Sequence, residues 1–296
     1  MTEPHLGELG VWGHLDSLPA PDAIDYVRRA EQLGYGTLWV PETVGREPIA
    51  LLSLLTGATE TISLGTSIVN IWGRDAQAAR MAALTIAEVS GGRFVLGLGV
   101  SHPHLATKLR GHQFERPLTR MREYLAAYRT AAYRGPMADA VPEPPVLIAA
   151  LRERMTDLAA TDADGALPYL VTPERVAWMR ARLDAAVAGA RPVLAVTLPV
   201  VIGPPDDRES ARNYLKPYLR TPTYQASWEL QGFDMRDWQL PASDRLVDAM
   251  VAIGSVELVR ERIGAMRGSG ADHVAIIPLA ADGSTEQLAT LEAIAG

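Results

Sequence analysis

Four residues between positions 97 and 102 combine backbone freedom with groups that can do chemistry. Gly97 and Gly99 lie two positions apart, and Ser101 and His102 follow them. Because glycine has no Cβ atom, a flat or anionic group can approach the backbone closely there. The serine offers a hydroxyl, and the imidazole, with an ordinary pKa of about 6.5, can exchange a proton near neutral pH. This pattern favours a small-molecule site with proton transfer at His102.

The residues before this group predict a buried parallel strand. Residues 93–99 read RFVLGLG, a short run of apolar, β-branched and aromatic side chains. Such a run is typical of a strand covered on both faces. The polar residues therefore come just past the carboxyl end of a strand, where α/β proteins bind their ligands.

Strand-like and helix-like segments alternate along the whole chain. The predicted strands are 9–15, 37–40, 62–70, 93–99, 145–150, 165–167, 193–202 and 273–279. The predicted helices are 21–33, 48–58, 75–89, 117–131, 152–161, 173–188, 255–267 and 285–294. Eight of each in alternation predict one α/β domain over residues 1–296, a (β/α)8 TIM barrel. A three-layer open sheet is the alternative.

Residues 204–243 interrupt this alternation directly after the seventh strand. They contain five prolines among tyrosines, tryptophans and a phenylalanine, too aromatic for a disordered linker. A barrel needs only about 250 residues, so this segment is an insertion. An insertion that follows a strand emerges at the catalytic face, and we interpret it as a lid that shapes an apolar substrate pocket. An extra packing layer is the alternative. The proline-rich segment 134–145 predicts an exposed loop.

Polar residues also follow the other predicted strands. The candidates are His14 and Asp16 after the first strand, Glu42 and Thr43 after the second, Ser67, Asn70 and Trp72 along the third, and His104 after the fourth. After the fifth strand, residues 150–154 (ALRER) lead straight into a helix. Free backbone N–H groups near Leu151 and the side chains of Arg152 and Arg154 could bind a phosphate there. An ordinary strand-to-helix junction is the alternative.

Composition bounds the classes of function. The chain has 296 residues, a net charge of −7 and no cysteine, which indicates one cytoplasmic domain without disulfides. No pattern of a signal peptide or membrane span is seen, and scattered arginines argue against nucleic acid. A small-molecule substrate is the expected partner. His102 and His104 could ligate a metal with Glu42, Asp16 or His14, but a metal-dependent barrel hydrolase usually needs more such ligands, and we expect no metal.

Four short segments carry a resemblance to a known family. They are residues 30–43 (AEQLGY and LWVPET within them), 62–68 (ISLGTSI), 92–99 (GRFVLGLG) and 271–274 (ADHV). In these segments the chain resembles the luciferase-like monooxygenase superfamily, and within it the actinobacterial oxidoreductases that use the deazaflavin coenzyme F420. The resemblance implies a barrel whose mouth holds the deazaflavin ring, with the phosphate near strands four and five. It also implies a cis peptide between Ser67 and Ile68.

Residue types and resemblance together give the candidate site. The predicted cofactor-binding residues are Glu42, Ser67, Ile68, Gly99, Val100, Ser101, His102, Ala150, Leu151, Arg152 and Arg154. Relatives usually carry a histidine where Thr43 stands, and sugar-phosphate dehydrogenases of the group carry a glutamate where His102 stands. We therefore predict His102 as the proton-transfer residue, with Glu42 as a second catalytic candidate that sets the hydrogen bonding of the pocket.

The predicted reaction is hydride transfer between F420 and an apolar or aromatic carbonyl, alkene or alcohol. An FMN-dependent monooxygenase is the first alternative, and a non-catalytic cofactor-binding protein is another. Helix 75–89 is rich in alanine, and relatives associate through the helices after strands two and three. The chain is therefore expected to form a homodimer.

Overall fold

The computed structural model describes residues 5–136, 142–187, 189–204, 207–280, 285 and 287–296, and its strands close into a parallel barrel. The barrel strands are β1 (Leu9–Trp12), β2 (Thr37–Val40), β3 (Ser63–Thr66) with its continuation β4 (Val69–Asn70), β5 (Phe94–Gly99), β6 (Val146–Ala149), β7 (Gly165–Leu167), β8 (Val193–Ile202) and β10 (His273–Pro278). They pair in this order, and β10 pairs with both β8 and β1. The predicted (β/α)8 barrel is therefore confirmed.

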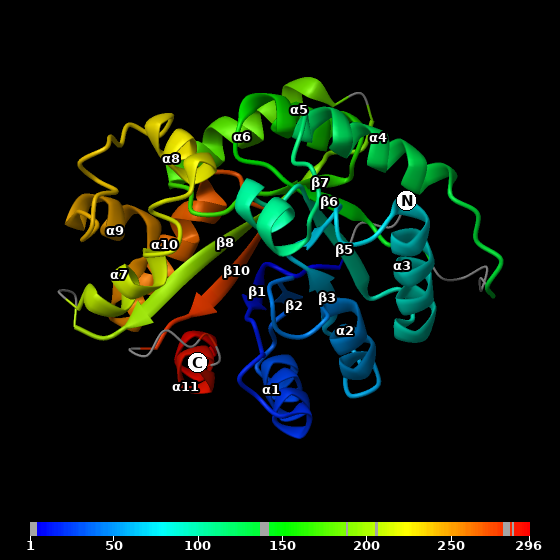
Figure 1. Cartoon of the computed structure of the whole chain (residues 1–296). Helices are drawn as coiled ribbons and strands as arrows, with labels where there is room; N and C mark the ends of the chain where they lie inside the picture. The colour runs from blue at the N-terminus through cyan, green and yellow to red at the C-terminus, as the bar shows by residue number, and fades with distance from the viewer. Residues whose placement is uncertain (1–4, 137–141, 188, 205–206, 281–284, 286) are drawn as a thin grey trace.

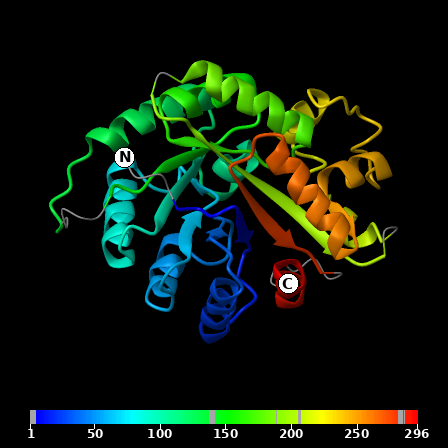
Figure 2. The same cartoon turned by 180° about the vertical axis from the view of Figure 1, so that it is seen from behind.

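Eight helices at the predicted positions surround the strands (Figure 1, Figure 2). They are α1 (Ala20–Gln32), α2 (Pro48–Thr56), α3 (Ala76–Ser90), α4 (Pro117–Thr130), α5 (Glu153–Thr161), α6 (Pro173–Ala186), α10 (Val256–Gly268) and α11 (Leu288–Ala295). Side-chain caps fix several starts: Asp75 accepts a hydrogen bond from the Ala78 amide, and Thr172 from the Arg175 amide. Within the described ranges, no helix has the length and apolar character that crossing a membrane requires.

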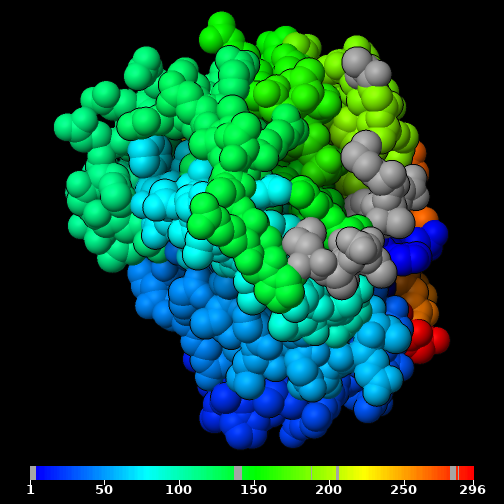
Figure 3. Space-filling view, turned by 90° about the vertical axis from the view of Figure 1, so that its right-hand side faces the viewer, coloured from blue at the N-terminus to red at the C-terminus, as the bar shows by residue number. Residues whose placement is uncertain are grey.

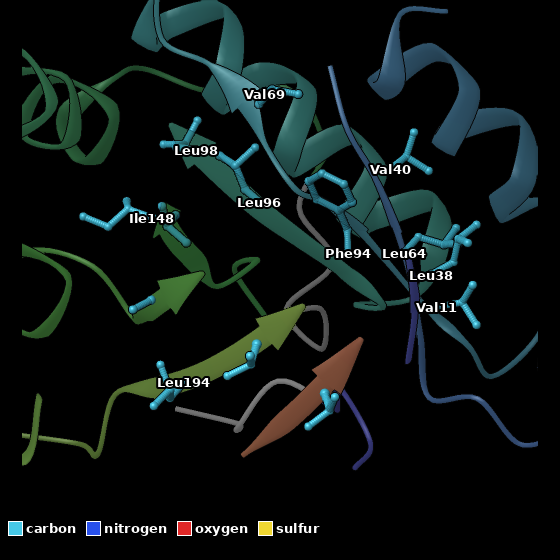
Figure 4. Close-up of a cluster of buried hydrophobic side chains, with 14 of the residues drawn as sticks. Val11, Leu38, Val40, Leu64, Val69, Phe94, Leu96, Leu98, Ile148 and Leu194 are labelled. Carbon is cyan, nitrogen blue, oxygen red and sulfur yellow. The ribbon is translucent and has the colours of Figure 1, made fainter. Parts of the chain in front are cut away.

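Two hydrophobic cores hold the barrel, and strand alternation separates them. In β5, Phe94, Leu96 and Leu98 point outward into the core shared with the helices (Figure 4). Val95 lies between them in sequence and belongs to the second core, which includes Trp39 and Leu167. Alternation along a strand sends successive side chains to opposite faces, so one strand serves both cores.

The two glycines of β5 lie on the barrel-interior side of this alternation. A Cβ atom on Gly97 would lie 1.8 Å from the Thr66 carbonyl oxygen, and one on Gly99 would lie 2.5 Å from Ile68 Cδ1. The Thr66 hydroxyl also accepts a hydrogen bond of 2.8 Å from the Gly97 amide. Gly97 is thus required for close packing of the strands, rather than for the approach of a ligand that its residue type suggested.

The segment after β8 forms three short helices and a strand. These are α7 (Glu209–Leu215), α8 (Pro222–Glu229), α9 (Asp244–Met250) and β9 (Ala252–Gly254), which pairs with the end of β8. Neither α9 nor β9 is among the predicted elements. The aromatic residues of the segment, Trp228 among them, share the second core with barrel residues such as Trp12. Residues 205–206 lie outside the described part.

Other departures from the predicted elements are local. The predicted strand 62–70 is divided into β3 and β4, and a π-helix, η1 (Leu105–Leu109), follows β5 in a stretch with no predicted element. The described parts of 134–145 have no helix or strand, and residues 137–141 lie outside the description. The last helix begins at Leu288, later than the predicted start at residue 285. Residues 281–284 and 286 also lie outside the described part of the chain.

His273 lies fully buried at the start of β10, and its two hydrogen bonds specify a neutral ring. Its Nε2 accepts from the Trp39 indole at 2.9 Å, and its Nδ1 lies 2.8 Å from the Gly7 carbonyl oxygen, to which it must donate. A second ring proton would face the indole N–H. Burial accordingly lowers the pKa of His273 to about 4.

We expect acid to destabilise the protein through this residue. The unfolded state binds the proton below about pH 6.5 and the folded state only below about pH 4, so the free energy of unfolding falls as pH falls through this window. The free energy of unfolding has fallen by about 3 kcal/mol when the pH reaches the lower end of this window. Urea unfolding at pH 7 and 4.5 measures it. His273→Gln should lose much of this pH dependence, whereas the same change at exposed His112 should keep it; equal slopes in all three proteins would contradict the assignment.

Candidate active site

The predicted site residues follow four strands that are neighbours in the barrel. Glu42 comes after β2, Ser67 and Ile68 join β3 to β4, residues 99–102 end β5, and residues 150–154 follow β6. Because parallel strands end at the same rim, the structure places these residues on one side of the barrel mouth. A recess of about 1140 Å³ at the opposite end, lined by Arg80 and His273 among others, contains none of them.

His102 is a partly buried imidazole beside the insertion. Its ring centroid is 5.3 Å from that of Tyr224 in α8 and 6.1 Å from that of His104. The Nδ1 atom is buried and has no hydrogen-bond partner within the described ranges. Burial, with a smaller contribution from His104, lowers the pKa of His102 to about 4. The ring is therefore neutral at pH 7, and the ordinary pKa assumed from the sequence does not hold.

Glu42 lies at the centre of a buried charge network. One carboxylate oxygen accepts hydrogen bonds from the Asn70 amide at 2.6 Å, the Asn70 side chain at 2.7 Å and Arg74 at 3.1 Å. The other accepts from Arg74 at 3.1 Å and from Arg110 at 2.9 Å. The side chain is 7% exposed. Glu42 thus ties β4 and the segment after η1 to the end of β2.

The break between β3 and β4 lies at the Ser67–Ile68 peptide, which is cis. The Trp12 indole donates to the Ser67 carbonyl at 3.0 Å, and the Glu42 amide donates to the Ile68 carbonyl at 3.1 Å. The resemblance implied a cis peptide at this pair, and the structure contains it. Two neighbouring segments, β1 and the end of β2, therefore hold the backbone of this bulge.

The junction after β6 contains a buried cation that the sequence did not indicate. Arg152 and Arg154 are exposed, and Ala150 is buried. Arg175, in the first turn of α6, is 7% exposed and donates to the Leu151 carbonyl at 2.7 Å. Its guanidinium carbon lies 3.8 Å from the centre of the Trp178 ring, and its Nε is buried without a partner among the described residues. Burial lowers its pKa.

Tyrosines from β7 and the insertion meet on the other side of the mouth. Tyr169, two residues after β7, hydrogen-bonds through its hydroxyl to those of Tyr214 and Tyr218. Tyr169 also stacks on Trp12, with ring centroids 6.3 Å apart and planes 16° from parallel. Tyr224 contacts both Tyr169 and Tyr218. The sequence identified the insertion aromatics as a group but not Tyr169, their partner on the barrel.

Three strand ends at the mouth also carry unusual backbone. Leu15 after β1, Ser101 after β5 and Leu170 after β7 have φ values of 53°, 55° and 54°. Left-handed backbone is uncommon for residues other than glycine and costs roughly 1–3 kcal/mol where the surroundings enforce it. Such residues concentrate at functional sites. In the described ranges, no three His, Cys, Asp or Glu side chains are grouped to hold a metal ion.

Comparison with known proteins gives consistent results. The model of the luciferase-like monooxygenase family matches residues 5–273. A Mycobacterium tuberculosis protein provisionally named a coenzyme F420-dependent oxidoreductase is 28% identical over an alignment of 346 positions, which covers 97% of each chain.

Solved structures share the fold. The F420-dependent tetrahydromethanopterin reductase of Methanopyrus kandleri superposes with a TM-score of 0.76 at 17% identity, over 97% of both chains. The oxygenating constituent of 3,6-diketocamphane monooxygenase from Pseudomonas putida, solved with FMN, gives 0.74 at 17% identity over 97% of this chain and 96% of that one. Because the family model spans nearly the whole barrel, from β1 to the start of β10, this chain belongs to the luciferase-like monooxygenase family.

Proposed function

We propose that this protein is a cytoplasmic oxidoreductase that transfers a hydride between coenzyme F420 and an apolar or aromatic carbonyl, alkene or alcohol. The observation that carries the proposal is the His102 imidazole at the mouth, whose buried Nδ1 lacks a partner in the described part. A full-length relative named for F420 supports the cofactor. An FMN-dependent monooxygenase is the second candidate, because a structure of this fold holds FMN.

The residues at the mouth fit such a cofactor. His102 Nδ1 is an unsatisfied polar atom, and the backbone before α5 has an N-cap, Arg152, with no side-chain hydrogen bond. The buried Arg175 cation lies beside this junction. We assign residues 99–102 and the Ser67–Ile68 bulge to the ring, and residues 150–154 to the phosphate. Bound there, F420 would supply the hydride acceptor or donor.

His102 would handle the proton that accompanies the hydride. A neutral imidazole can accept a proton from an alcohol oxygen, or hold a hydrogen bond to a carbonyl oxygen. Its low pKa makes it a weak base and leaves almost no imidazolium at pH 7 to act as an acid. Glu42 instead acts as a positioning residue, because both of its oxygens are already occupied by Asn70, Arg74 and Arg110.

The phosphate assignment predicts weaker cofactor binding when a cation is removed. A charge-assisted contact to phosphate contributes roughly 1.5–3 kcal/mol, so losing it should weaken F420 affinity by about ten- to a hundredfold. Fluorescence titration of Arg152→Ala and Arg154→Ala with F420 measures this, with the exposed Arg134→Ala as the matched control. Unchanged affinity in both variants would place the phosphate elsewhere.

Titration of the purified protein with F420 and with FMN tests the function itself. We expect saturable F420 binding and at least tenfold weaker FMN binding, followed by F420 reduction in the presence of an oxidisable alcohol. Tighter FMN binding would favour the monooxygenase. Tight F420 binding without turnover over a broad panel of substrates would favour a non-catalytic carrier.

We also propose a homodimer formed through α2 and α3. Exposed apolar side chains lie on these neighbouring helices: Leu54 is 46% exposed, Met81 48% and Val89 59%. Figure 3 views the side of the barrel that carries these helices. Burying such side chains against a second copy would remove apolar surface from water. Light scattering at micromolar concentration measures the oligomeric state.

A further inference from the structure

We propose that the hydroxyl groups of Tyr169, Tyr214 and Tyr218 form a substrate subsite for one acceptor oxygen, a carbonyl or alcohol oxygen carried on an apolar or aromatic framework. The proposal rests on the proposed oxidoreductase function, and it assigns a substrate contact to the insertion. It would make the insertion a specificity-determining part of the site.

The three hydroxyls come from two separate parts of the chain. Tyr169 follows β7 of the barrel, Tyr214 is in α7, and Tyr218 lies just beyond α7. The Tyr169 hydroxyl bonds to the Tyr214 hydroxyl and donates to the Tyr218 hydroxyl at 3.3 Å. A barrel strand end and the insertion thus build this cluster together.

The Tyr218 hydroxyl is held less closely than the other two. Each tyrosine hydroxyl carries a single proton and two acceptor lone pairs. Tyr169 and Tyr214 bond closely to each other, whereas the bond from Tyr169 to Tyr218 is 3.3 Å long. A long hydrogen bond is weak, so little is lost when the Tyr218 proton turns to a ligand oxygen. Tyr218 is therefore the donor that we assign to the substrate.

The surroundings favour a neutral acceptor on an apolar framework. Aromatic rings pack against the tyrosines of the cluster: Tyr224 lies 5.1 Å from Tyr218 and Trp12 lies 6.3 Å from Tyr169, measured between ring centroids. Tyr224 also contacts His102, so the subsite lies beside the proposed proton-transfer residue. Burial raises the pKa of all three tyrosines, which keeps their hydroxyls protonated as donors.

A pair of isosteric probes tests the subsite. Acetophenone carries a carbonyl oxygen where α-methylstyrene carries a methylene group, so the two share their shape but differ in the acceptor. Ligand-observed NMR titrations of the F420-loaded and the cofactor-free protein would give both affinities. We expect Tyr218→Phe to weaken acetophenone binding by about five- to tenfold and to change α-methylstyrene binding by less than twofold.

Further variants separate a hydrogen bond from a packing effect. Tyr214→Phe should weaken acetophenone binding less than Tyr218→Phe, because it removes the proton farthest from the ligand. Tyr133→Phe, after α4, is the matched control, and the melting temperature of each variant reports its folding. Equal losses for both probes, no loss for either, or no saturable acetophenone binding to the unaltered protein would overturn the proposal. If Tyr218→Phe weakens acetophenone binding selectively but the protein does not bind F420, the cofactor assignment fails and the subsite stands.

Discussion

Replacing His102 with alanine is expected to lower turnover by about 10²–10⁴-fold, the usual contribution of a general acid or base. The affinity for F420 should change by only a few-fold, because a proton-transfer group acts mainly in the transition state. Steady-state and single-turnover kinetics with F420, together with a binding titration, measure both quantities. The matched control is His104→Ala, which removes an exposed imidazole two residues away.

The pH profile distinguishes proton transfer from a purely structural role. If neutral His102 accepts the proton of an alcohol, kcat/KM for alcohol oxidation should be flat near pH 7 and fall as pH drops through about 4, where the imidazole becomes charged. A fall centred near pH 6.5 would mean that the ring is not desolvated in solution. Intact turnover with collapsed F420 binding would assign His102 to the cofactor site instead.

The barrel and one side of its mouth could be predicted because both depend on local sequence patterns. A short apolar run marks each buried strand, and the change to polar residues marks its carboxyl end, as at Gly99 to His102. Glu42 was identified in the same way, whereas the role of Ser67 came from the resemblance to the luciferase-like superfamily. These residues need no partner distant in sequence to be recognised as strand ends.

The partners of those residues could not be predicted, because they come from distant segments. Arg110 bonds to Glu42 across 68 positions, and Arg175 bonds to Leu151 from the start of another helix. Tyr169 meets Tyr214 only once the insertion packs on the mouth. Arginine and tyrosine occur widely on protein surfaces, so nothing local separates these residues from solvent-facing ones. The lowered pKa of His102 was missed for the same reason, since burial comes from tertiary packing.

Replacing Glu42 with glutamine is expected to destabilise the protein by about 3–5 kcal/mol, the usual effect of removing one partner from a buried ion pair. The Arg74 side chain is 12% exposed and that of Arg110 is 27% exposed. Without the carboxylate, Arg74 keeps its ion pair with Glu47 at 2.7 Å, but Arg110 loses the one ion pair that it makes among the described residues. The two cations then lie close together with little water to screen them. The NH₂ group of the new glutamine would also stand where a carboxylate oxygen of Glu42 accepts hydrogen bonds, so donor would face donor. Urea unfolding measures the loss.

A charge-matched variant and an exposed control decide whether buried charge is the cause. Arg110→Met removes the cation that Glu42→Gln leaves without a carboxylate, so the double variant with Glu42→Gln should recover part of the lost stability. Glu292→Gln breaks an ion pair with Arg29 in which both side chains are more than 40% exposed, and it should cost less than about 1 kcal/mol. If Glu42→Gln cost no more than this control, the network would contribute little to the fold. Because the Glu42 amide also holds the Ile68 carbonyl of the bulge, loss of the network should weaken F420 binding as well.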